Sequence, residues 1–178
     1  MADREQQRRA LVEGAADYVM REGLTGLSLR PLAASLETSD RMLLYYFSSK
    51  DDLIDEVLKV LSANLQALLG SAIPGVRVSV TTLVVAADAL LAAPEMRPAV
   101  EVCLELLGLA ARGAEPYATA ARTLLRDWVA WAERHIDGPA RGRRSRAIGA
   151  VACIEGILVL RGSGLGEGLP AALLGLLR

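Results

Sequence analysis

The sequence predicts an all-α protein of about nine helices, with a small N-terminal helix-turn-helix domain and a larger helical domain after it. Apolar residues recur at helical spacing along almost the whole chain, and no segment shows sustained strand alternation. Of the 178 residues 52% are hydrophobic and the formal net charge is −1, which excludes a disordered chain. We place the domain boundary after residue 48, giving domains of residues 1–48 and 49–178.

The N-terminal domain is expected to contain three helices, over residues 3–22, 28–35 and 39–45. Gly23 ends the first helix, Ser28 can cap the second, and Thr38 or Ser39 can cap the third. The residues expected to face inward are Leu11, Ala15, Tyr18 and Val19 in the first helix and Leu29, Leu32, Ala33 and Leu36 around the second.

A long fourth helix should begin near Lys50, because Ser48 with Asp51 and Ser49 with Asp52 both fit a capping box. Its expected apolar stripe is Leu53, Val57, Leu61, Leu65 and Leu68. Proline and glycine then separate further helices over residues 76–93, 94–111, 116–136 and 142–161, and a last short one over 170–177.

Residues 28–45 have the form of a helix-turn-helix. Ala33 is small where the two helices must cross, and Leu43 is apolar where the second helix packs on the first. Glu37 falls at the turn, where glycine is commonest because φ is often positive. A plain three-helix packing unit would show the same pattern, so the motif alone leaves both readings open.

The flanking residues resemble the N-terminal domain of the tetracycline-repressor (TetR) family of bacterial transcriptional regulators. The most specific part is residues 46–53, with the sequence YFSSKDDL, and the resemblance covers about residues 8–58. It implies a dimeric transcriptional repressor that a small molecule releases from operator DNA. The chain departs from the family pattern at Glu37, usually glycine, at Leu44, usually tyrosine, and at Arg41, often glycine.

The third helix should therefore enter the major groove of double-stranded operator DNA. Arg41 is the first candidate for a base contact, because arginine pairs bidentately with guanine. Lys50 and Ser28 stand at helix starts, where free N–H groups favour phosphate. The expected DNA-binding residues are Ser28, Arg30, Ser39, Asp40, Arg41, Met42, Tyr45, Tyr46 and Lys50.

The second domain should bind an effector and form a homodimer. A largely apolar pocket is expected from Met96, Cys103, Leu107, Tyr117, Trp128 and Trp131, although the two tryptophans suit plain core packing equally well. Small residues at Gly149, Ala152, Cys153 and Gly156 suit a dimer seam along residues 142–161 and 170–177, or close packing within the chain. Two recognition helices also need half-sites about 34–36 Å apart, which requires a dimer.

Several classes of function are not expected. Two distant cysteines and a single histidine offer no metal or cofactor site, and no catalytic set of side chains can be assembled for an enzyme. Asp88, expected to face solvent, and Glu155 interrupt the longest apolar stretches, which argues against a membrane span. Cys103 and Cys153, fifty positions apart within apolar stretches, are expected to be buried free thiols in a reducing cytoplasm. The rival hypothesis is a helical small-molecule carrier or interaction protein that no longer reads DNA. Seven basic and seven acidic residues among the first fifty favour this rival.

Overall fold

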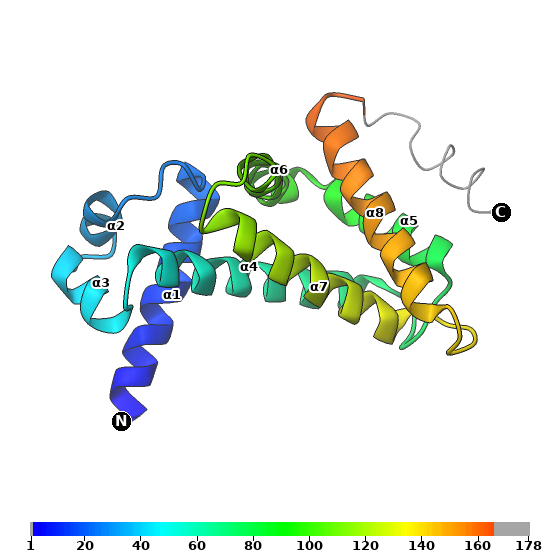
Figure 1. Cartoon of the computed structure of the whole chain (residues 1–178), viewed down its shortest axis with the longest axis horizontal. Helices are drawn as coiled ribbons and strands as arrows, with labels where there is room; N and C mark the ends of the chain where they lie inside the picture. Colours follow the sequence, from blue (N-terminus) through cyan, green and yellow to red (C-terminus); the bar gives the residue numbers. More distant parts are fainter. Residues whose placement is uncertain (1, 166–178) are drawn as a thin grey trace. The chain divides into compact units, whose positions relative to one another are not determined.

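The computed structural model describes residues 2–165, which form eight α-helices and one 3₁₀ turn without any strand (Figure 1). The all-α prediction is confirmed. The helices are α1 (Ala2–Glu22), α2 (Leu29–Ser35), α3 (Asp40–Tyr46), α4 (Lys50–Ala72), α5 (Val80–Leu91), α6 (Arg97–Ala111), α7 (Tyr117–His135) and α8 (Arg143–Gly162), with the turn η1 (Pro94–Met96) before α6. The helix expected over residues 170–177 lies outside the described residues.

The described residues divide into two compact units. The first, called here the N-terminal unit, contains residues 2–64 and Glu105–Ala121. The second, called here the C-terminal unit, contains Leu65–Leu104 and residues 122–165. Helices α4, α6 and α7 each contribute residues to both units. The domain boundary after residue 48 stays a prediction about separate folding domains.

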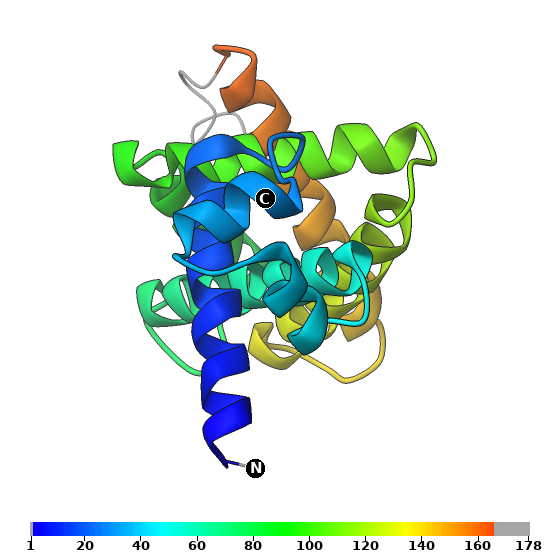
Figure 2. The same cartoon turned by 90° about the vertical axis from the view of Figure 1, so that its left-hand side faces the viewer.

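In the N-terminal unit, α2 packs against α1 and α3 (Figures 1 and 2). The apolar stripe expected on α1 is buried, as are Leu32 and Ala33 of α2 and Leu43 of α3. Ser39 caps α3, since its Oγ accepts a hydrogen bond from the backbone N–H of Met42 at 3.2 Å. These contacts fix the short helices, which are too brief to be stable alone.

Helix α4 begins at Lys50 as the capping pattern predicts. Ser49 Oγ accepts from the Asp52 N–H at 3.1 Å, and the Asp52 carboxylate accepts from the Ser48 N–H at 2.9 Å. The expected stripe is wrong at its far end, because Leu68 is 47% exposed and Leu69 is buried instead. Leu69 continues the steps of four residues from Leu53 to Leu65, whereas Leu68 breaks them. Because each such step turns the helix by about 40° beyond a full turn, the buried face itself winds slowly around α4 and leaves Leu68 outside it.

The C-terminal unit is built on the packing of α5 against α8. Helix α5 starts at Val80, later than the expected residue 76, because the chain before it is extended and pairs with the end of α7. There the Val78 N–H donates to the His135 carbonyl at 2.8 Å, and the Asp137 N–H donates to the Val78 carbonyl at 2.9 Å. Those backbone bonds compete with a further helical turn and replace it.

The expectation that Asp88 faces solvent is wrong. Asp88 is only 2% exposed, and its Oδ1 accepts hydrogen bonds from Arg161 Nε at 3.0 Å and Nη2 at 2.5 Å. The pair joins α5 to α8 across the buried side of both helices. A carboxylate on an otherwise apolar helix is buried here because a cation from a distant helix compensates the lost hydration.

Candidate DNA interface and candidate ligand pocket

The segment from α2 to α3 has helix-turn-helix geometry. Glu37 occupies the turn at φ 51°, the left-handed conformation in which glycine is commonest. The Thr38 N–H donates to the Ala33 carbonyl at 2.9 Å and closes the turn. Ala33 is 3% exposed and Leu43 fully buried, so the crossing of the two helices is tightly packed.

The outward face of α3 is free to meet a partner. Asp40 and Arg41 are exposed, and Met42, Leu44 and Tyr45 are 41%, 47% and 58% exposed. Among residues 2–165, the guanidinium of Arg41 has no hydrogen-bond or ion-pair partner. Apolar and cationic side chains left uncovered on one short helix are typical of a recognition surface.

Helix α1 supports the end of α3 through two arginines. The guanidinium of Arg4 lies 4.9 Å from the ring centroid of Tyr45, and that of Arg8 lies 5.1 Å from the Phe47 ring. Arg8 also donates to Glu56 Oε2 at 3.1 Å. Sequence reasoning missed these contacts, although Arg4 and Arg8 are four residues apart and therefore share one face of α1.

The remaining residues expected to bind DNA lie around this surface. Ser28, Arg30 and Ser39 are exposed, and Tyr46 and Lys50 are half-buried. Ser28 is the N-cap residue of α2, but its side chain makes no capping hydrogen bond. Lys50 is the first residue of α4 and therefore stands at the positive end of a long helix dipole.

The loop between α1 and α2 is held from α6 by Glu105, which sequence reasoning did not single out. Its carboxylate accepts from the backbone N–H groups of Leu24 at 2.6 Å and Thr25 at 2.8 Å. Burial raises the pKa of Glu105, but the hydrogen bonds from Thr25 and Leu24 outweigh it, so the pKa lies below its ordinary value. The carboxylate therefore stays ionised and fixes the approach to α2.

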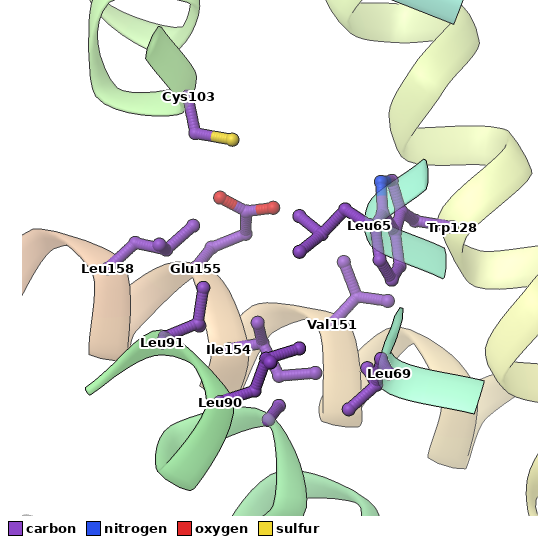
Figure 3. Close-up of a pocket in the computed structure, with 11 residues that line it drawn as sticks. Leu65, Leu69, Leu90, Leu91, Cys103, Trp128, Val151, Ile154, Glu155 and Leu158 are labelled. Carbon is purple, nitrogen blue, oxygen red and sulfur yellow. The ribbon is translucent and has the colours of Figure 1, made fainter. Parts of the chain in front are cut away.

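The C-terminal unit contains a cavity of about 50 Å³ between α4, α5, α6, α7 and α8 (Figure 3). Its walls are almost entirely aliphatic, with one indole, one thiol and one carboxylate. The lining residues are Leu65, Leu69, Ala87, Leu90, Leu91, Cys103, Trp128, Val151, Ile154, Glu155 and Leu158.

Glu155 is the one acidic side chain in this lining, and it points from α8 into the cavity toward Leu65 and Cys103 (Figure 3). Its Oε2 is buried and has no hydrogen-bond partner among the described residues. Burial raises the pKa of Glu155 above its ordinary value. Burial, and secondarily the charge of Glu155, raise the pKa of the Cys103 thiol to about 12, so the thiol stays protonated.

Of the six residues expected in the pocket, Cys103 and Trp128 line this cavity. Trp131 belongs to the core of the C-terminal unit and stacks on His135, with ring centroids 4.2 Å apart. The others do not line the cavity: Met96 is buried in η1, and Leu107 and Tyr117 lie in the N-terminal unit. Glu155 could have been recognised from sequence as a charge within an apolar stretch.

The small residues of α8 lie on an uncovered face. Gly149, Ala152 and Gly156 are exposed, and a Cβ built at either glycine meets no atom of residues 2–165 within 4 Å. Ile148 and Val159, on the same helix, are each 50% exposed. Cys153 instead packs partly buried against the core. Packing among the described residues therefore gives no reason for the two glycines and Ala152 to be small.

Comparison with known proteins relates the first part of the chain to one family of regulators. Residues 11–57 match the family model described as bacterial regulatory proteins, tetR family. No curated protein matches the chain significantly. Residues 2–165 contain no helix suited to crossing a membrane and no group of side chains suited to holding a metal ion.

Solved structures share the fold over nearly the whole chain. A Rhodococcus sp. protein assigned to the TetR family has a TM-score of 0.73 at 19% identity, covering 98% of this chain and 96% of its own. A regulator from Streptomyces coelicolor, SCO7518, has a TM-score of 0.70 at 20% identity and 95% coverage of each chain. The multidrug-binding protein EbrR, solved with imidazole, has a TM-score of 0.69 at 21% identity, covering 97% and 90%.

Proposed function

We propose that the chain is a TetR-family regulator that represses transcription from an operator and is released by a small molecule. The match of residues 11–57 to the tetR family model and the helical fold shared with solved structures assigned to that family support the proposal. The observation that carries the proposal is the exposed face of α3, the second helix of a well-packed helix-turn-helix. TetR-family proteins are transcriptional regulators, not enzymes.

The DNA contact is proposed to divide between base and phosphate. Arg41 has a free guanidinium on the exposed side of α3, so it pairs with a guanine edge in the major groove. Lys50 and the hydroxyl of Tyr45 stand at the margin of that surface and meet the backbone. Arg4, stacked on Tyr45, restrains the ring and brings a further positive charge beside it. These contacts operate although the first fifty residues carry no net charge.

The effector is proposed to occupy the cavity of the C-terminal unit, and the similar fold of EbrR, a multidrug-binding protein solved with imidazole, supports a small-molecule ligand. Helix α6 supplies Cys103 to its wall and Glu105, two residues later, to the loop before α2. A ligand that displaces α6 would therefore also displace the carboxylate that holds Leu24 and Thr25. Such a ligand shifts the protein away from its DNA-binding state only if it binds the displaced state more tightly than the DNA-binding one.

The protein is proposed to bind as a homodimer through α8. The uncovered face of this helix presents glycine and alanine beside Ile148 and Val159, which lets a second helix approach closely and bury apolar surface. A two-fold axis there would pair identical faces, as closed dimers require. The homodimer supplies the two recognition helices that a palindromic operator needs.

Mobility-shift titration with DNA from upstream of the protein's own gene tests the proposal. Arg41→Ala should cost about 1–3 kcal/mol per half-site on the operator and relax specificity at one base pair. Lys50→Ala should weaken binding to operator and scrambled DNA alike and reduce the salt slope by about one per half-site. Arg126→Ala removes an equal charge at an exposed site of the C-terminal unit and serves as the matched control.

The same titrations separate the rival hypothesis. If neither Arg41→Ala nor Lys50→Ala changes binding, residues 28–50 are not the DNA-reading surface, and the carrier hypothesis takes its place. Equal losses for Arg41→Ala on both DNAs would make Arg41 a backbone contact.

A further inference from the structure

We propose that the cavity selects a compact protonated amine with an apolar body, and that Glu155 is the residue that recognises its charge. The inference rests on the proposed effector site and names the chemistry of its ligand. Two features carry it: the unpartnered carboxylate oxygen inside the cavity and the aliphatic walls around that oxygen.

The buried carboxylate of Glu155 lowers the stability of the folded protein. A buried polar atom without a hydrogen bond destabilises the fold, and a buried charge does so more strongly. Arg161, also on α8, is already engaged with Asp88, so it does not compensate Glu155. A ligand N–H would give Oε2 the donor it lacks, and a positive charge would favour the ionised form.

The lining decides what the rest of the ligand must be. Seven leucine, isoleucine or valine side chains and one alanine offer no further hydrogen bond to a polar ligand. The face of the Trp128 indole can attract a cation, which reinforces the preference for positive charge. The thiol of Cys103 stays protonated and adds no competing negative charge.

The size of the cavity limits the ligand in this state. A water needs about 10–15 Å³ of such space, so about 50 Å³ accommodates the bulk of roughly four waters. A branched chain of three carbons bearing one nitrogen matches that bulk. Isopropylamine meets this description, is cationic at neutral pH, and has a neutral isostere in 2-propanol and an anionic relative in isobutyrate.

The test is calorimetric titration of the full-length protein, without DNA, with these three compounds. Isopropylammonium should bind at least about tenfold more tightly than 2-propanol, since a hydrogen bond to a charged group is the stronger kind. Isobutyrate should not bind measurably. Tryptophan fluorescence should change when isopropylammonium binds, because Trp128 lines the cavity.

Glu155→Gln should abolish the preference for the cation and bring the two affinities within about twofold, because the amide keeps the shape and removes the charge. This variant should also melt at a higher temperature than the native protein at neutral pH, which shows that it folds. Glu95→Gln, the same change at an exposed residue, is the control and should retain the preference.

Three results would overturn the proposal: no binding of isopropylammonium at millimolar concentration, equal or tighter binding of 2-propanol, or an unchanged preference in Glu155→Gln. Since DNA is absent, each of these outcomes leaves operator binding untouched. Loss of operator binding in the mobility-shift titrations would instead refute the proposed function without affecting amine binding.

Discussion

Removing either Asp88 or Arg161 alone from their ion pair should destabilise the protein, whereas removing both together should cost little. It joins α5 to α8, the helices that supply most of the cavity wall. The side chain of Asp88 is 3% exposed and that of Arg161 is 19% exposed. Arg161→Leu leaves a carboxylate that cannot reach water, and it should lower the free energy of unfolding by about 3–5 kcal/mol.

The reverse substitution should cost less. Asp88→Leu leaves the guanidinium of Arg161 in the last turn of α8, where its long side chain can turn toward solvent, so the expected loss is about 1–3 kcal/mol. The double variant replaces a buried pair by apolar side chains and should lie within about 1 kcal/mol of the native protein. The double variant should therefore be more stable than the sum of the two single losses predicts.

Urea unfolding followed by far-ultraviolet circular dichroism measures all four proteins, at one protein concentration so that the proposed dimerisation affects all of them alike. Arg97→Leu is the matched control, since Arg97 pairs with Glu101 at 81% and 61% side-chain exposure and should contribute less than about 1 kcal/mol. If the double variant loses the sum of the two single losses, Asp88 and Arg161 do not stabilise the protein as a pair and the reasoning fails.

Three further predictions concern the other sites. Gly156→Leu should shift sedimentation toward monomer, whereas Gly108→Leu, also into open space, should not; an unchanged dimer would place the interface elsewhere. Glu105→Gln should lower the melting temperature at neutral pH. Because the pKa of Glu105 is lower in the folded protein than in the unfolded chain, the difference from the native protein should shrink as pH falls from about 4.3, the unfolded value, through the folded value. A difference that stays constant would contradict this. Glu155→Gln should raise the melting temperature at neutral pH. Because burial raises the pKa of Glu155 in the folded protein, the gain should diminish as pH falls through that raised value. A gain independent of pH would refute the idea that the buried charge of Glu155 destabilises the fold.

Local chemistry made much of the fold predictable from the sequence. The start of α4 follows from Ser49 and Asp52, whose hydrogen bonds span only three and four residues. The turn at Glu37 and the burial of Leu43 follow from spacing within one short motif. Such features depend on neighbours in the chain, so residue order alone carries the information.

The features that the sequence left open depend on groups far apart in the chain. Asp88 is buried because Arg161, 73 residues away, pairs with it, and Glu105 holds the loop at Leu24 from 81 residues away. Glu155 becomes the one carboxylate of an aliphatic cavity only when five helices surround it. Helical periodicity indicates which face of a helix is apolar, but not which helix covers that face or which polar side chain is enclosed with it. The sequence by itself therefore determined most of the helices and the helix-turn-helix motif, whereas the tertiary structure decided the ion pair and the charge inside the pocket, because burial and pairing are properties of packed helices and not of any single segment.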